Sequence, residues 1–233
     1  MRLAWVIFLL ISMGEFSIAW TESSTVPAIP QNKYSGDNHL ILKEIKIGQS
    51  LLNKGQYGDA VPHLLKALEG NPNLGEVHFS LGLAYAGIGK RSEKVKHYLE
   101  TLRVSPQHGP AHFKLGLAEA SQNRHQEAID YYRKALEDNP EAARIYYFLG
   151  ISLYLTKRFK EAVPAFQSAA KFNPAMPETP YNLGLTLLNM GRYSEAVNSL
   201  KKAFEMNPNI LSLPEKMGLA RKRRLSPKQI ISP

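Results

Sequence analysis

The fold is decided by a stretch of 34 residues that the chain repeats, and its clearest copy, residues 143–176, reads ARIYYFLGISLYLTKRFKEAVPAFQSAAKFNPAM. A proline stands near the end of every copy, 34 residues after the one before: Pro72, Pro106, Pro140, Pro174 and Pro208. A glycine keeps the same spacing: Gly48, Gly82, Gly116, Gly150, Gly184 and Gly218. Self-similarity at this period indicates stacked repeats, so function is sought on a repeated surface rather than in a catalytic pocket.

Each repeat is predicted to contain two helices. Within residues 143–176, apolar residues recur at helical spacing in two series, which a charged break at Lys157-Arg158 separates. The second series stops before Asn173-Pro174, because the residue before a proline is biased away from helical conformation. The repeat is therefore expected to fold as a helix hairpin.

A small residue on each helix explains how the hairpin closes. Gly150 lies on the first helix and Ala162 follows twelve residues later on the second, as in most of the other repeats. A glycine costs a helix about 1 kcal/mol relative to alanine, so its recurrence requires a packing reason. Close approach of the two backbones supplies that reason, with larger residues filling the space beside them: Leu64, Tyr98, Tyr132, Phe166 and Leu200.

In this arrangement the chain resembles the tetratricopeptide repeat family. The motifs that carry the resemblance are the Leu-Gly pair, the closing proline, the turn glycines Gly55, Gly89 and Gly191, the turn aromatics Tyr57, Phe159 and Tyr193, and the alanines Ala67, Ala135, Ala169 and Ala203. The resemblance implies an all-α, right-handed superhelical solenoid of five tandem helix-turn-helix hairpins, with a concave groove lined mainly by the first helices. We number these repeats 1 to 5: residues 41–74, 75–108, 109–142, 143–176 and 177–210.

Residues 211–233 follow the fifth repeat and are expected to form a capping helix and a basic tail. Met217-Gly218 stands in the first-helix register, and no second helix follows it. A lone helix of this kind covers the last apolar face of a repeat array.

Repeat 2 departs from the pattern. Lys94 and Thr101 stand where the other repeats have small alanines, and Arg91 replaces the turn aromatic. Either Lys94 extends its stem past Gly82 to reach water, or the second helix tilts away from the first. We expect this helix, from about residue 91 to 103, to be the least stable of the array.

Two positions of the first helix are the candidate partner-binding groove. In proteins of the family that the chain resembles, these positions face the groove: Phe79, Leu83, Phe113, Leu117, Tyr147, Ile151, Tyr181 and Leu185. They predict a groove for a protein or peptide segment with apolar anchors. The alternative is that the aromatic residues only pack between neighbouring hairpins. A carboxylate clamp is not expected, because Lys114, Arg144 and Asn182 share no register.

The formal charge of +9 is concentrated near the C-terminus. The basic residues there are Lys216, Arg221, Lys222, Arg223, Arg224 and Lys228. They suit an anionic membrane surface or another polyanion, or they serve only to keep the helix end solvated. No nucleic acid partner is expected, because the chain is expected to be exported.

Export is predicted from residues 1–19. Arg2 precedes the apolar run Leu3–Met13, and the small residues Ser17 and Ala19 suit cleavage after Ala19. The alternative is an uncleaved anchor, although the run is short of the ~20 residues that span a bilayer. A polar linker is expected at 20–40, and the mature protein is expected in the periplasm or secreted.

No enzyme, cofactor, metal or small-molecule substrate is expected. The chain has no cysteine, which excludes disulfides, thiol chemistry and cysteine zinc sites. His78, His108 and His112 lack a carboxylate at matching spacing, and Pro110 interrupts the helical face between the last two. The glycines of residues 82–90 lack the lysine spacing of a phosphate loop.

Overall fold

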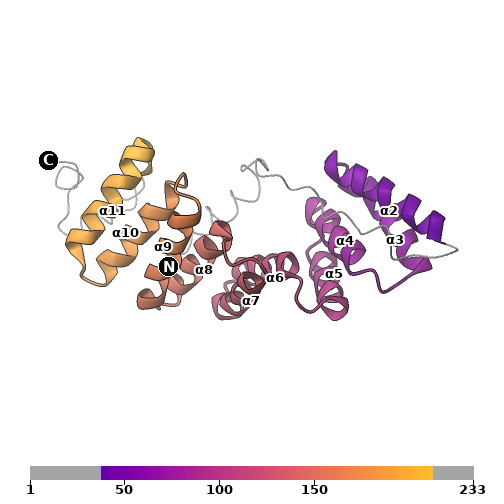
Figure 1. Cartoon of the computed structure of the whole chain (residues 1–233), viewed down its shortest axis with the longest axis horizontal. Helices are drawn as coiled ribbons and strands as arrows, with labels where there is room; N and C mark the ends of the chain where they lie inside the picture. The colour runs from indigo at the N-terminus through magenta and orange to yellow at the C-terminus, as the bar shows by residue number, and fades with distance from the viewer. Residues whose placement is uncertain (1–37, 212–233) are drawn as a thin grey trace. The chain divides into compact units, whose positions relative to one another are not determined.

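The structure is a computed structural model that describes residues 38–211, and every regular element in this part of the chain is helical (Figure 1). The elements are α2 (Asn38–Asn53), α3 (Tyr57–Gly70), α4 (Gly75–Gly87), α5 (Arg91–Val104), α6 (Gly109–Ser121), α7 (His125–Asp138), α8 (Ala143–Leu155), α9 (Phe159–Phe172), α10 (Glu178–Asn189), α11 (Tyr193–Met206) and the 3-10 helix η2 (Pro208–Leu211). The predicted signal peptide, residues 20–37 of the linker and the basic tail lie outside the described residues. Residues 38–40 belong to helix α2, although they fall inside the expected linker.

The helices belong to two compact blocks. The N-terminal block, residues 1–122, contains α2 to α6, and the C-terminal block, residues 123–233, contains α7 to α11 and η2. Helices adjacent in the chain pack against each other within each block, as α2 does on α3, α4 on α5, α8 on α9 and α10 on α11. Successive hairpins also touch, because α3 packs on α4 and α9 packs on α10. The expectation of an all-α fold built from tandem helix hairpins is confirmed.

The turn inside each repeat uses the left-handed backbone conformation at one position. Gly55, Gly89 and Gly191 have φ of 73°, 76° and 74°. The two remaining repeats place Asn123 and Lys157 there, with φ of 62° and 61°. The same tight turn therefore forms in all five repeats, although only glycine adopts it without steric cost.

The glycine of the first helix packs under a large side chain of the second. A Cβ placed on Gly82 would lie 2.3 Å from the Tyr98 ring, and one on Gly150 would lie 2.7 Å from the Phe166 ring. Gly48 and Gly184 meet Leu64 and Leu200 in the same way, each at 2.7 Å. This close approach is the packing reason that the sequence required.

Helix α5 of repeat 2 stays packed against α4 despite its unusual residues. Tyr98 covers Gly82 and is only 2% exposed, so the two helices approach here as closely as in the other hairpins. Thr101 is fully buried, and its hydroxyl donates to the His97 carbonyl over 2.9 Å. Lys94 is half-buried. The structure therefore favours a lysine that extends along a packed helix over a helix that tilts away.

Within residues 38–211, no helix is both long and apolar enough to cross a bilayer.

Candidate functional site

The four groove residues predicted in the N-terminal block differ in accessibility. Phe79 on α4 is 3% exposed, and its ring lies 5.7 Å from the Tyr98 ring and 4.8 Å from the His108 ring. Since His108 is the residue before α6, Phe79 fills the junction between repeats 2 and 3. Leu83, Phe113 and Leu117 are half-buried and so keep part of their apolar surface exposed.

The C-terminal block shows the same division. Tyr147 and Ile151 on α8 and Tyr181 on α10 are 8%, 6% and 6% exposed, whereas Leu185 is half-buried. The Tyr147 ring packs edge-on against Phe166, with centroids 6.2 Å apart. Burial raises the pKa of the Tyr147 phenol well above its usual range, and it raises the pKa of Tyr181 to about 12. These tyrosines therefore serve as packed, neutral side chains.

Two tyrosine–asparagine pairs connect α8 and α10 in the C-terminal block. Asn182 donates from Nδ2 to the Tyr147 hydroxyl over 3.2 Å, and Asn189 donates to the Tyr154 hydroxyl over 3.0 Å. Both pairs join residues 35 apart, and within each helix the partners lie seven residues apart. The sequence analysis missed this pairing, because it considered Asn182 only as a candidate for binding a carboxylate. The signal that could have revealed it is the occurrence of two Tyr and Asn residues at the same spacing of 35 residues.

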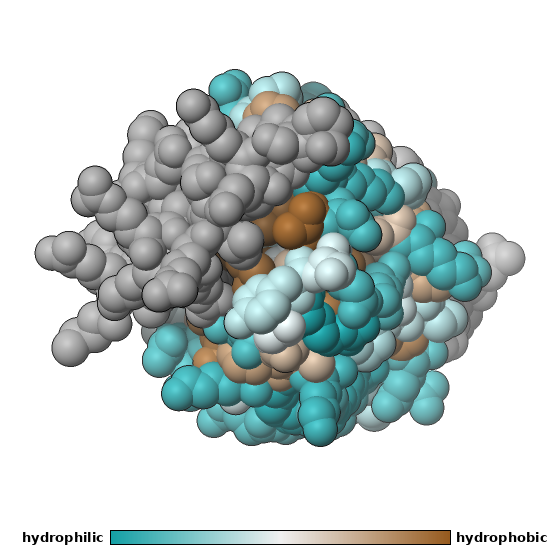
Figure 2. All heavy atoms as spheres, turned by 90° about the vertical axis from the view of Figure 1, so that its left-hand side faces the viewer, coloured by the Kyte–Doolittle hydropathy of each residue, from teal (hydrophilic) through white to brown (hydrophobic). Residues whose placement is uncertain are grey.

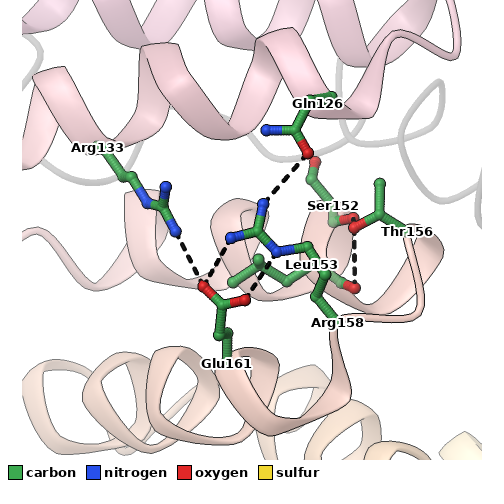
Figure 3. Close-up of polar contacts among 7 residues, drawn as sticks. All are labelled: Gln126, Arg133, Ser152, Leu153, Thr156, Arg158 and Glu161. Atoms are coloured by element: carbon green, nitrogen blue, oxygen red, sulfur yellow. Dashed lines mark hydrogen bonds and ion pairs between the residues drawn. The ribbon is translucent and has the colours of Figure 1, made fainter.

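An ion-pair network joins α7 to the start of α9 in the same block (Figure 3). Arg158 contacts Glu161 through two nitrogens, each 2.7 Å from a carboxylate oxygen, and it also donates to the Gln126 side chain over 3.2 Å. Arg133 on α7 reaches Glu161 over 3.0 Å. The arginines hold the pKa of the Glu161 carboxyl below its usual value. Because these groups are largely exposed to solvent, the network adds little stability.

The histidines considered as metal ligands make other contacts. His78 lies 3.1 Å from His97 between their Nδ1 atoms and donates from Nε2 to the Pro72 carbonyl over 3.0 Å. His112 donates to the Pro106 carbonyl, and His108 faces Glu76 at 3.2 Å. Among the described residues, no group of three or more His, Cys, Asp or Glu could hold a metal ion. The basic residues from Lys216 to Lys228 lie outside the described part of the chain.

Comparison with protein families identifies the repeat. Tetratricopeptide repeat models match residues 45–93, 95–139, 113–177 and 181–210. The matches cover most of the chain, so the protein belongs to the tetratricopeptide repeat family. The expectation from the sequence motifs is confirmed.

Several solved structures share the fold. A crystal structure of MamA is 26% identical, with a TM-score of 0.64, over 71% of this chain and 97% of that one. MamA from Desulfovibrio magneticus RS-1, from residue 41 to its end, is 21% identical, with a TM-score of 0.67, over 76% of this chain and 99% of that one. YrrB, described as a TPR protein with an unusual peptide-binding site, is 21% identical, with a TM-score of 0.68, over 76% and 92% of the two chains. The comparison with curated proteins finds no match.

Proposed function

We propose that this protein is an exported, non-enzymatic scaffold whose first-helix surfaces bind a segment of a partner protein through apolar anchors. Its family and its structural neighbours support a protein-interaction role. Export rests on the sequence of residues 1–19, where an apolar run precedes small residues.

The observation that carries the proposal is the set of half-buried apolar residues at repeated first-helix positions. Leu83, Phe113, Leu117 and Leu185 are packed well enough to hold one orientation and keep apolar surface for a partner. Side chains of this kind are the usual anchor sites when an extended or helical segment binds a groove. The other four candidates are buried and form part of the core under these residues: Phe79, Tyr147, Ile151 and Tyr181. The proposed set of contact residues is therefore smaller than the eight that the sequence suggested.

Site-specific photo-crosslinking tests this proposal. A photoreactive amino acid is placed at Phe113 or Leu185, and matched control positions are Leu65 on α3 and Leu99 on α5, which are apolar second-helix residues with 39% and 47% exposure. In the compartment where the protein resides, a partner protein should attach at position 113 and at position 185, and at neither 65 nor 99. Attachment of a partner at the control positions alone would exclude the first-helix surface as the binding site.

A second candidate is peripheral binding to an anionic membrane surface or other polyanion. It is favoured by the charge of the last twenty residues, where six basic residues oppose Glu215. Each basic residue near an anionic leaflet adds about 1 kcal/mol to the binding free energy. Because salt screens this attraction, binding of this kind should weaken strongly as the salt concentration rises.

A further inference from the structure

The turn of repeat 2 carries an exposed apolar residue at its tip. Ile88 follows the last residue of α4 and is 40% exposed. It stands between Gly87 and Gly89, so neither neighbour in the chain covers it with a side chain. At the same position of repeat 5, Met190 packs against a buried cluster that contains Leu187. Hairpin packing therefore does not explain why repeat 2 keeps an isoleucine in solvent.

Three basic residues follow this tip. Lys90 and Arg91 are exposed, and Lys94 lies three residues further along α5, on the same helix face as Arg91. The acidic residue of this segment is Glu93. The end of the repeat 2 hairpin thus combines an apolar tip with a positive charge.

The turn of repeat 1 adds a fourth basic residue. An ideal Cβ on Gly87 would lie 2.3 Å from the Tyr57 ring, so the turns of repeats 1 and 2 lie side by side. Lys54 is exposed in the first of these turns, and Asp59 follows it in the first turn of α3. We call Lys54, Ile88, Lys90, Arg91 and Lys94 the turn-tip surface. Its four basic residues stand against two acidic ones, Asp59 and Glu93, which leaves a net charge of +2.

The cations of the turn-tip surface are not neutralised by ion pairs. Among residues 38–211, no ion pair involves Lys54, Lys90, Arg91 or Lys94. In repeat 4, Arg158 occupies the position of Lys90 and contacts Glu161 at 2.7 Å. Lys90 has Glu93 at the same spacing, but its ammonium lies over the Tyr85 ring, 5.9 Å from the centroid. These cations therefore remain available to an anion from outside the chain.

The turn of repeat 5 has a similar composition without the available charge. Tyr193 is 59% exposed there, but Arg192, the residue before it, contacts Glu195 through two nitrogens at 2.7 and 2.6 Å. Figure 2 faces the side of the C-terminal block that carries α11, where hydrophilic side chains stand beside apolar ones. An exposed apolar residue beside a neutralised arginine offers little attraction to an anion. The turn-tip surface is therefore the stronger candidate for an anionic partner.

We propose that the turn-tip surface binds an anionic lipid bilayer, with Ile88 entering the headgroup region and the four cations facing lipid phosphates. Binding of this kind scales with the apolar area that enters the bilayer and with the attraction between basic residues and anionic lipids. A lipid surface fits better than an acidic protein, because one aliphatic side chain at the tip of a turn offers no groove for a protein side chain. The proposal does not involve the first-helix groove or the basic residues from Lys216 to Lys228.

A fluorescent label at the tip tests this proposal locally. The chain has no cysteine, so Ile88→Cys in the full chain can be labelled at one site with the environment-sensitive dye NBD. Leu65→Cys and Leu99→Cys are the matched controls, because these exposed apolar residues lie on second helices away from the turns. With vesicles of phosphatidylcholine and phosphatidylglycerol, the emission at position 88 should shift to the blue, and the emission at 65 and 99 should not. Vesicles of phosphatidylcholine alone should leave all three unchanged.

Two outcomes of the labelling experiment would overturn the proposal. If the protein sediments with anionic vesicles while the emission at 88 is unchanged, another part of the chain binds the lipid. If anionic vesicles change nothing at 88 and no protein sediments, the surface does not bind lipid, which is the result expected for an acidic protein partner.

A pair of charge variants provides the second measurement. Lys90→Gln with Arg91→Gln removes two cations of the turn-tip surface, and Lys157→Gln with Lys160→Gln removes two exposed cations at the turn of repeat 4, where the tip residue is Thr156. The first variant should bind anionic vesicles about 30-fold more weakly than the unmodified chain, since each basic residue near the leaflet contributes a factor of about five. The second should bind within about twofold of the unmodified chain, because it lies outside the proposed contact. Equal weakening in the two variants, or none in the first, would show that the turn-tip surface is not the lipid site.

Discussion

At the scale of single residues, the turn position shows how a repeat tolerates exceptions. Three repeats use glycine in the left-handed conformation, while repeats 3 and 4 use Asn123 and Lys157. Asparagine is the non-glycine residue that enters this region most readily, because its side chain hydrogen-bonds locally. Lysine has no such compensation. Lys157 is therefore the most strained of the five turn residues.

Replacing Lys157 with glycine should stabilise the protein. Removing the steric penalty of the left-handed conformation stabilises the folded state by about 1–2 kcal/mol. The greater conformational freedom of glycine in the unfolded chain offsets roughly 0.5–1 kcal/mol of this gain. We expect a net increase of up to about 1 kcal/mol in the free energy of unfolding, measured by urea titration. Lys160→Gly, at an exposed position inside α9, is the control and should lose about 1 kcal/mol. Destabilisation by both variants would contradict the strain argument.

At the scale of elements, α5 differs from its counterparts in what it buries. Its buried side chains are His97, Tyr98 and Thr101, whereas α9 buries five apolar residues over the same length of 14 residues. Burial lowers the pKa of His97 to about 4, with His78 and Lys96 acting in the same direction and Glu100 opposing them. The hairpin of α4 and α5 therefore depends on a neutral His97.

This difference predicts a less protected α5 with a pH-dependent stability. We expect its amides to show lower hydrogen-exchange protection than those of α9 at neutral pH. Because the pKa of His97 is lower in the folded state than in the unfolded state, the unfolded chain binds more protons below pH ~6.5. Protection of α5 should therefore fall as the pH drops from about 6.5 towards 4, with a smaller change in α9.

The variant His97→Asn separates the effect of His97 protonation on α5 from the effect of the other residues that α5 buries. Asparagine keeps an amide N–H near the position of Nδ1, which lies 3.1 Å from His78 Nδ1, and does not titrate. The pH dependence of α5 protection relative to α9 should become shallower in this variant. An unchanged pH profile would assign the effect to other groups, and equal protection of α5 and α9 at neutral pH would remove the claim that α5 is the weaker helix.

At the scale of the whole molecule, the repeat array offers two kinds of surface with different physics. The apolar contact proposed for Leu83, Phe113, Leu117 and Leu185 is expected to depend weakly on salt, whereas binding through the basic tail is expected to depend on long-range charge.

Neutralising the tail should leave partner capture intact. In the variant Arg221→Gln, Lys222→Gln, Arg224→Gln, crosslinking at positions 113 and 185 should match the unmodified chain at low and at high salt. Binding to anionic vesicles, if the tail provides it, should weaken by more than about 100-fold, since three residues each supply about 1 kcal/mol. Loss of partner crosslinks in this variant would move recognition from the first helices to the tail.

The sequence was sufficient to predict the features of this protein that depend on helix periodicity and on turn residues. The 34-residue period, the helix ends before proline and the packing of first-helix glycines under large second-helix side chains were all predicted, and helices α4, α6 and α8 begin at residues 75, 109 and 143. Repetition made this possible, because each copy tests the same pattern independently. The exposure of the candidate groove residues could not be predicted in this way, since the same position holds buried Phe79 in repeat 2 and half-buried Phe113 in repeat 3.

By itself the sequence determined the family, the hairpins and the register that gives each residue its place, because helix periodicity and turn chemistry act over a few residues. Only the tertiary structure decided which first-helix residues keep a free surface, which histidines pair and where the asparagines bind the tyrosines. Those outcomes depend on side chains that the next repeat brings alongside, roughly 35 residues away in the cases of Tyr147 with Asn182 and Tyr154 with Asn189. The burial and the hydrogen bonds of a residue therefore depend on the adjacent repeat as much as on the residue itself.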